Sequence, residues 1–396
     1  MKSRKSVTVV RNGRIVTADQ GVIEGGTIAW QEGRIVFIGG RGEEPPPEIT
    51  NDSPTITINA DSGWVLPGYI DVHVHGGAGY DFMDATHEAY DAITSFHVRH
   101  GTTGMLATTV TAPSDALTSV LHAASAYQSN GPRYAELLGV HLEGPFISSL
   151  WSGAQNPAHI VEPQLEWANQ WVDKYPGLIR ILTLAPELKG ASELIAWLNA
   201  KGIVAACGHT DADYDCINEA VAHGLRHAVH SFNAMKGLHH REPGTVGAIL
   251  TNDRISAEII ADGHHVHPAC IRILAAQKRS DQVILVTDAI SAAGLEDGSY
   301  NSAGLKIVIR DGVSRLRDGG QLAGSTLTMI QAFQFMVREA GFPIDQVSRF
   351  ASGNPARLLG LQDERGSLAQ GKLADILILS ANLELQQVWI QGRKVV

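Results

Sequence analysis

The chain has 396 residues, enough for one large domain and a smaller one, and Lys and Arg total 31 against 41 Asp and Glu. The resulting net charge of -10 excludes nucleic acid and anionic membranes as partners, and 44% apolar residues indicate a soluble globular protein. Glycine, with 41 residues, and histidine, with 17, are both unusually frequent.

The cysteines and the first residues bear on the compartment. Cys207, Cys216 and Cys270 are odd in number and lack the spacing of a metal or redox motif. The apolar run after the basic residues near the start is too short for a signal peptide or a membrane span. We therefore expect a cytoplasmic protein.

Both ends of the chain have the pattern of short β-strands. Residues 1–63 alternate β-branched runs such as SVTVV and IVTA with turn sequences such as RNGR, which are typical of hairpins. Residues 362–396 repeat this pattern in ADILILS and LELQQVWI. We predict a small β-sandwich domain built from both chain ends.

Residues 64–361 alternate apolar strand runs with helical patterns, which indicates βα units and a parallel sheet. Eight such units close a (β/α)8 TIM-like barrel, an α/β fold. We count eight candidate strands, at residues 69–75, 104–110, 135–144, 179–187, 203–210, 227–234, 255–263 and 283–289.

An insertion at residues 291–325 follows the eighth predicted strand. It is rich in Gly and Asp, and its segment LKIVIRDGVSRLRDGG predicts a hairpin. Because active sites of such barrels lie at the C-terminal ends of the strands, the insertion is placed to cover the barrel mouth.

Ionisable residues close five of the eight predicted strands. The first strand ends in His73 and His75, whose spacing puts both side chains on one face. Four further strands end in single residues, namely Glu143, His209, His230 and Asp288. We expect these four imidazoles and two carboxylates to converge at the barrel mouth.

This donor set favours a divalent transition metal over Ca²⁺ or Mg²⁺. We expect one or two ions, zinc first and Fe, Mn, Co or Ni as alternatives, with Glu143 bridging two of them. The metal would activate a water, and Asp288 would act as the general acid and base.

The loops after strands 6 and 7 predict an anion site. HSFNAMKGLHHREPG and IADGHHVHP gather Arg and His at a face that often binds phosphate. Two other kinds of site are excluded. GSLAQGKL is not a P-loop, because it has Leu373 where a P-loop needs Ser or Thr, and a serine hydrolase is not supported, because no G-x-S-x-G motif occurs.

Taken together, these motifs resemble a known family. PGYIDVHVHGG, GVHLEGPFIS, CGHT, HSFNAM with HHREPG, IADGHHV and LVTDA, in this order and spacing, are similar to the N-acetylglucosamine-6-phosphate deacetylases of the amidohydrolase superfamily. The resemblance covers essentially the whole chain. It implies a metal-dependent hydrolysis that releases acetate from a phosphorylated amino sugar.

The resemblance also implies roles for individual residues. It makes Glu143, His209 and His230 ligands of the main metal, and the presence of His73 and His75 implies a second ion. It assigns the substrate phosphate to Asn233, the Ala234 backbone, Arg241 and His265, some of them donated across a homodimer interface. Gln155 stands where some members have a sugar-contacting His.

Several alternatives stay open. The galactosamine 6-phosphate deacetylases share these motifs, and the sequence does not decide the sugar epimer. The anion-binding loops argue against a cyclic amide hydrolase or a deaminase. A non-catalytic relative used for binding or assembly should have lost metal ligands, whereas all six positions are filled here.

Overall fold

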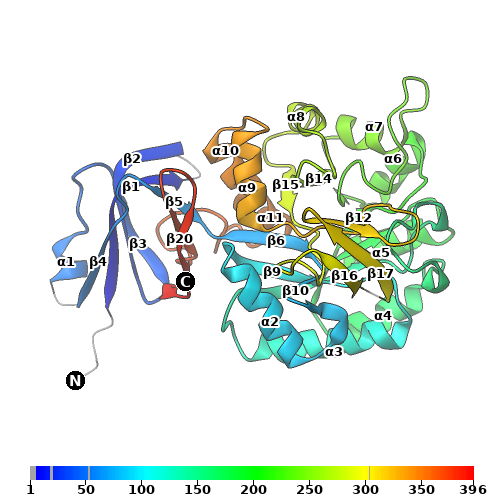
Figure 1. Ribbon diagram of the computed structural model, residues 1–396, viewed down its shortest axis with the longest axis horizontal. Coiled ribbons are helices and arrows are strands. Elements are labelled where there is room, and N and C mark those ends of the chain that lie inside the picture. Colours follow the sequence, from blue (N-terminus) through cyan, green and yellow to red (C-terminus); the bar gives the residue numbers. More distant parts are fainter. Residues whose placement is uncertain (1–5, 18–20, 52–53, 303) are drawn as a thin grey trace.

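The computed structural model describes residues 6–17, 21–51, 54–302 and 304–396. These residues form a β domain and a larger barrel that lie side by side, as Figure 1 shows. The N-terminal basic residues 2–5, which entered the compartment argument, lie outside the described residues. No helix in the described part of the chain is long and apolar enough to cross a membrane.

Both chain ends contribute to the small domain, as the sequence predicted, and its eight strands form one branched sheet. Its order is β21-β20-β19-β5-β1-β2-β3, with β4 paired to β1. Residues 64–67 were expected on the barrel side of the boundary, but they form β5 and pair with β1 and β19. The strands are β1 (Val7–Thr17), β2 (Gly21–Gln31), β3 (Arg34–Gly39), β4 (Thr55–Asn59), β5 (Trp64–Pro67), β19 (Ile376–Leu379), β20 (Leu385–Ile390) and β21 (Arg393–Lys394).

The predicted barrel is confirmed by eight parallel strands in sequential order. Its first and last strands are joined near their C-terminal ends, where the amide of Asp288 donates to the carbonyl of His73 at 2.8 Å. The strands are β6 (Tyr69–Val74), β9 (Thr102–Thr108), β10 (Glu136–Glu143), β11 (Ile179–Leu184), β12 (Val204–Cys207), β13 (His227–Ala228), β14 (Ser256–Ile260) and β15 (Val283–Val286).

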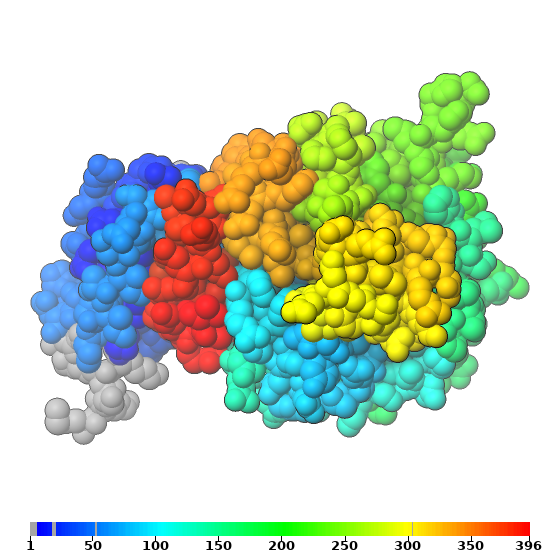
Figure 2. Space-filling model, viewed as in Figure 1, coloured from blue at the N-terminus to red at the C-terminus, as the bar shows by residue number. Residues whose placement is uncertain are grey.

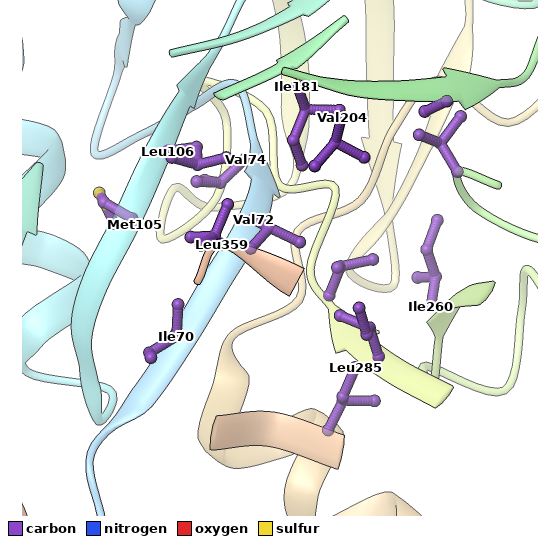
Figure 3. Close-up of a cluster of buried hydrophobic side chains, with 14 of the residues drawn as sticks. Ile70, Val72, Val74, Met105, Leu106, Ile181, Val204, Ile260, Leu285 and Leu359 are labelled. Carbon is purple, nitrogen blue, oxygen red and sulfur yellow. The ribbon is translucent and has the colours of Figure 1, made fainter. Parts of the chain in front are cut away.

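Helices surround the barrel and bury their apolar faces against it. Figure 3 shows part of the core, in which aliphatic side chains of the barrel strands gather with Leu359. The longer helices are α2 (His87–Val98), α3 (Ser114–Ser129), α4 (Leu165–Lys174), α5 (Ala191–Ala200), α6 (Tyr214–His223), α7 (Gly244–Thr251), α8 (Pro268–Gln277) and α9 (Met329–Arg338). The short ones are α1 (Pro47–Thr50), α10 (Ile344–Ser348) and α11 (Asn354–Leu358).

The insertion forms a separate antiparallel sheet of three strands, β16 (Gly298–Ser302), β17 (Leu305–Arg310) and β18 (Val313–Leu316). The predicted hairpin is its β17–β18 pair. Figure 2 shows the insertion, in yellow, lying on the surface of the barrel. Its apolar side chains Leu305, Ile307 and Leu316 line the cavity at the barrel mouth, so it covers the site in the way that the sequence suggested.

Candidate metal centre

The six ionisable residues come together at the barrel mouth. His73 and Glu143 lie on β6 and β10, and His75 directly follows β6. His209, His230 and Asp288 each lie two residues beyond the end of a strand, and their φ angles are +48°, +29° and +49°. Such backbone is unfavourable for residues other than glycine and is concentrated at functional sites.

Glu143 is at the centre of the cluster. Its Oε1 lies 3.0 Å from Nε2 of His230 and 3.3 Å from Nε2 of both His73 and His209. Its other oxygen, Oε2, lies 3.4 Å from Nε2 of His75. The two oxygens therefore face different groups of imidazoles, which is the arrangement that a bridging carboxylate requires.

Asp288 closes the second side of the cluster. Its Oδ1 lies 3.1 Å from Nε2 of His75 and 3.6 Å from Nε2 of His73. Two triads, His73 with His75 and Asp288, and His73 with Glu143 and His230, each bring their ligand atoms within 4.8 Å of one another. The donors can therefore serve one ion or two.

The positions of the hydrogen atoms on the imidazole rings favour a metal ion in this cluster. Nδ1 of His209 and His230 must donate to the carbonyls of Trp151 and Asn233, at 2.8 and 3.1 Å, because a carbonyl only accepts. When both rings are neutral, their Nε2 atoms, 3.2 Å apart, present lone pairs to each other. Nε2 of His73 is buried and has no hydrogen-bond partner among the described residues. A cation between these nitrogens would bind the facing lone pairs of His209 and His230, and it would give Nε2 of His73 a partner.

The electrostatic surroundings of the two carboxylates also favour a metal ion. Burial by itself would raise the pKa of Glu143, but without an ion in the cluster the charge of His73, together with hydrogen bonds from His209 and His230 when their Nε2 atoms carry hydrogen, lowers it well below its usual range. For Asp288 burial is likewise outweighed, by His73 and His75, and its pKa is lowered. Both carboxylates are therefore held ionised, which suits ligands of a divalent cation.

Sequence reasoning missed Glu258, which is fully buried in β14. Its Oε2 accepts from Nδ1 of His73 at 2.8 Å and from the amide of His230 at 3.1 Å. Its Oε1 accepts from Nε2 of His227 at 2.9 Å, and Nδ1 of His227 is 2.7 Å from Oγ of Ser256. A carboxylate inside the apolar strand ISAEII was the available signal, and it orients His73 and the backbone at His230 from behind.

Replacing Glu258 with glutamine should weaken metal binding about 10- to 100-fold, because the amide cannot accept from both histidines at once. A chelator competition titration measures this affinity. Glu136→Gln is the matched control, since that carboxylate pairs with Arg365 at the other end of a barrel strand. Equal metal affinity in Glu258→Gln and the control would show that Glu258 does not support the ligands.

The cluster opens into a cavity of about 430 Å³. Of the residues that the resemblance assigned to substrate, the structure brings four to its wall, namely Gln155, Asn233, Ala234 and His265. Gln155 is already engaged: its amide donates to Oε2 of Glu143 at 2.6 Å and its oxygen accepts from the amide of Thr111 at 2.6 Å. In this arrangement Gln155 holds Glu143 in place.

Arg241 does not line this cavity. It is exposed on the loop that precedes α7, where its guanidinium contacts His240 at 2.6 Å. This loop projects from the barrel in Figures 1 and 2, and it also exposes Leu238. Within a single chain, Arg241 is therefore separated from the other residues assigned to the phosphate.

Known proteins match this chain over most of its length. The model of the amidohydrolase family matches residues 64–395. N-acetylglucosamine-6-phosphate deacetylases are similar over most of the chain: the Vibrio furnissii protein is 39% identical, covering 84% of this chain and 82% of its own, and the Bacillus subtilis protein is 38% identical, covering 95% and 94%. N-acetylgalactosamine-6-phosphate deacetylase of Escherichia coli O157:H7 is 39% identical, covering 86% and 90%.

Solved structures show the same similarity. A variant of the N-acetylglucosamine-6-phosphate deacetylase of Mycobacterium smegmatis, in complex with N-acetylglucosamine 6-phosphate, is 32% identical, with a TM-score of 0.91 over 99% of this chain and 100% of its own. The Pasteurella multocida deacetylase is 28% identical, also with a TM-score of 0.91, over 98% and 100%.

Proposed function

The chain belongs to the amidohydrolase family as a hydrolase of amide C–N bonds, and from this premise we propose that it deacetylates N-acetyl-D-glucosamine 6-phosphate. The products are D-glucosamine 6-phosphate and acetate. The observation that carries this proposal is the complete donor set at the mouth of the barrel, in a cavity shared with Asn233, Ala234 and His265.

His73, His75, Glu143, His209 and His230 would hold a divalent ion, which when bound would supply Lewis acidity for activating water and polarising an amide carbonyl. We propose zinc, because imidazole and carboxylate donors suit it, and two ions, because the two oxygens of Glu143 face different histidines. Fe, Mn, Co and Ni accept the same donors. Metal analysis of the purified protein identifies the ion and its stoichiometry.

Asp288 is proposed to move the proton. Amide hydrolysis forms a bond from water oxygen to the carbonyl carbon and breaks the C–N bond, while one proton passes from the water to the leaving nitrogen. Asp288 is a carboxylate on the wall of the cavity and can accept this proton. Its position beside His75, on the wall of the cavity, lets the same carboxyl return the proton to the amine.

The substrate phosphate is proposed to bind at Asn233, the backbone amide of Ala234 and His265. His265 is oriented by Asp262, whose Oδ2 accepts from its Nδ1 at 2.6 Å, and this leaves Nε2 for another partner. Gln155 is proposed to act on the sugar side only through Glu143, since both polar atoms of its amide are engaged.

We propose a homodimer in which Arg241 reaches the cavity of the partner subunit. The projecting loop and the exposed Leu238 support this, because Arg241 is remote from the cavity of its own chain. A cytoplasmic location is also proposed, since Cys207, Cys216 and Cys270 are all free thiols.

Replacing Arg241 with alanine should raise KM for the phosphorylated substrate at least tenfold and hardly change hydrolysis of unphosphorylated N-acetylglucosamine. The reason is the loss of charge-assisted hydrogen bonds to phosphate, each worth about 1.5–3 kcal/mol. Steady-state kinetics on both substrates measures the difference. Equal effects on the two substrates would remove Arg241 from the phosphate site.

Mixing subunits tests whether Arg241 acts across the interface. Arg241→Ala and Asp288→Asn proteins are unfolded and refolded together, so that mixed dimers form. If Arg241 acts in the partner's cavity, each mixed dimer has one intact site and recovers a low KM. If it acts in its own chain, no site is intact and the mixture stays defective.

The proposed function itself is tested by acetate release from N-acetylglucosamine 6-phosphate and from its galacto epimer. A kcat/KM at least tenfold higher for the gluco substrate is expected. A preference for the galacto epimer would favour the second candidate, which the similarity to the Escherichia coli protein supports. Release from neither substrate, with metal bound, would contradict both.

A further inference from the structure

A second cavity lies at the end of the barrel opposite to the metal centre. It has a volume of about 410 Å³ and is lined by the N-terminal ends of barrel strands and by α11 and the residues after it. Among the described residues, the ionisable side chains on its wall are five arginines and one aspartate: Arg180, Arg226, Arg254, Arg279, Arg357 and Asp281. We call it the arginine cavity.

The barrel brings these arginines together from distant parts of the sequence. Arg180 is the second residue of β11, Arg226 directly precedes β13, and Arg254 lies two residues before β14. Parallel strands begin at the same end of a barrel, so these side chains share one face. No linear motif in the chain contains them.

The single aspartate is shared between two of the arginines. Asp281 accepts from Arg279 at 2.8 Å and lies 3.7 Å from Arg357. Asp253 also acts on the charge of Arg279 but does not line the cavity. The nearby acidic groups therefore balance the charge of Arg279 and Arg357.

Among the described residues, no carboxylate contacts the other three arginines. Arg180 donates to the carbonyl of Leu359, and Arg226 makes a long contact of 3.5 Å to the side-chain oxygen of Asn199. For Arg254, no ion pair occurs within the described part of the chain. An acidic protein of net charge -10 thus concentrates uncompensated positive charge in one cavity.

Another buried arginine, Arg365, is paired with carboxylates. It pairs with Glu136 at 2.7 Å and Asp375 at 3.8 Å, and these carboxylates outweigh burial and raise its pKa. Burial instead lowers the pKa of Arg180 and of Arg226, and no carboxylate in the described ranges compensates for it. Partly desolvated guanidinium groups cost folding free energy, unless an anion balances their charge.

We propose that the arginine cavity is a second anion-binding site, which takes a small phosphorylated compound. Guanidinium groups bind phosphate oxygens in pairs of parallel hydrogen bonds, and several converging here would hold a dianion. The cavity volume is in the range of about 300–1,000 Å³ that small-molecule sites occupy. This site is separate from the proposed phosphate position at Asn233 and His265, which lies at the other end of the barrel.

Titration with inorganic phosphate tests the proposal. Calorimetry at constant ionic strength compares the metal-loaded wild type with the Arg226→Gln/Arg254→Gln double variant. Phosphate bound at the barrel mouth is common to both proteins, so the difference reports the arginine cavity. We expect one class of phosphate sites to weaken at least tenfold, since two charge-assisted contacts are lost.

Arg99→Gln is the matched control, because Arg99 follows α2 at the end of the barrel where β9 begins but does not line the cavity. It should bind phosphate as the wild type does. Equal phosphate binding in all three proteins would overturn the proposal. Crystals of the wild type soaked in phosphate give a test that does not depend on folding of the variants: phosphate between Arg226 and Arg254 supports the site, and phosphate only at the barrel mouth refutes it.

Discussion

An Asp288→Asn protein is expected to keep its metal and to lose about 10²- to 10⁴-fold in kcat, the usual contribution of a general acid and base. Asparagine preserves the shape of the side chain but accepts no proton at neutral pH. Turnover and metal content are measured on the same sample, so that loss of chemistry is separated from loss of the ion.

Asp345→Asn is the matched control for this change. Asp345 lies on α10, does not line the cavity, and its carboxylate pairs with Arg349 at 3.2 Å. Its replacement should leave kcat within a few-fold of wild type. A metal-replete Asp288→Asn protein with near-normal kcat would exclude Asp288 as the proton carrier.

Glu143→Gln should abolish both metal retention and hydrolysis. The glutamine has the same shape, but it removes the one carboxylate, within the part of the chain that the structure describes, whose two oxygens face both groups of imidazoles. Four neutral imidazoles without this negative charge bind a divalent ion far more weakly, and we expect at least a 100-fold loss of affinity. Metal content after dialysis and acetate release measure the two effects.

The control for Glu143→Gln is Gln155→Ala, which removes the amide that donates to Glu143 but keeps the carboxylate. We expect a smaller loss of metal affinity there, about tenfold, because supporting hydrogen bonds tune a ligand and do not replace it. If Glu143→Gln retained a full complement of metal after dialysis, the ion would have to sit at His73, His75 and Asp288 alone.

Much of the fold could be predicted from sequence because its signals are local. Strand runs and turn sequences are set by neighbouring residues, and each of the eight predicted barrel strands overlaps an observed one. The ends of the strands are predicted less accurately than their positions. The sixth strand was expected over residues 227–234 but ends at Ala228, because the backbone leaves the extended conformation at His230, whose φ is +29°.

The candidate site likewise has some residues that the sequence predicts and others that it does not. His73, His75 and Glu143 could be found from their places at the ends of strands, because parallel strands end at one face of a barrel. The support from Glu258 and His227 could not, since it depends on which interior side chains meet across the barrel. A buried carboxylate is only informative once its partners are known.

By itself, the sequence determined the barrel, the residue types at its mouth and the chemistry that they allow, because strand periodicity and donor type are properties of short segments. Only the tertiary structure decided how these residues are used. Closing the barrel puts Asp288 beside His73, turns Gln155 toward Glu143 and leaves Arg241 outside its own cavity. It also gathers the arginines at the opposite end. These outcomes depend on contacts between residues far apart in the chain, which no local pattern encodes.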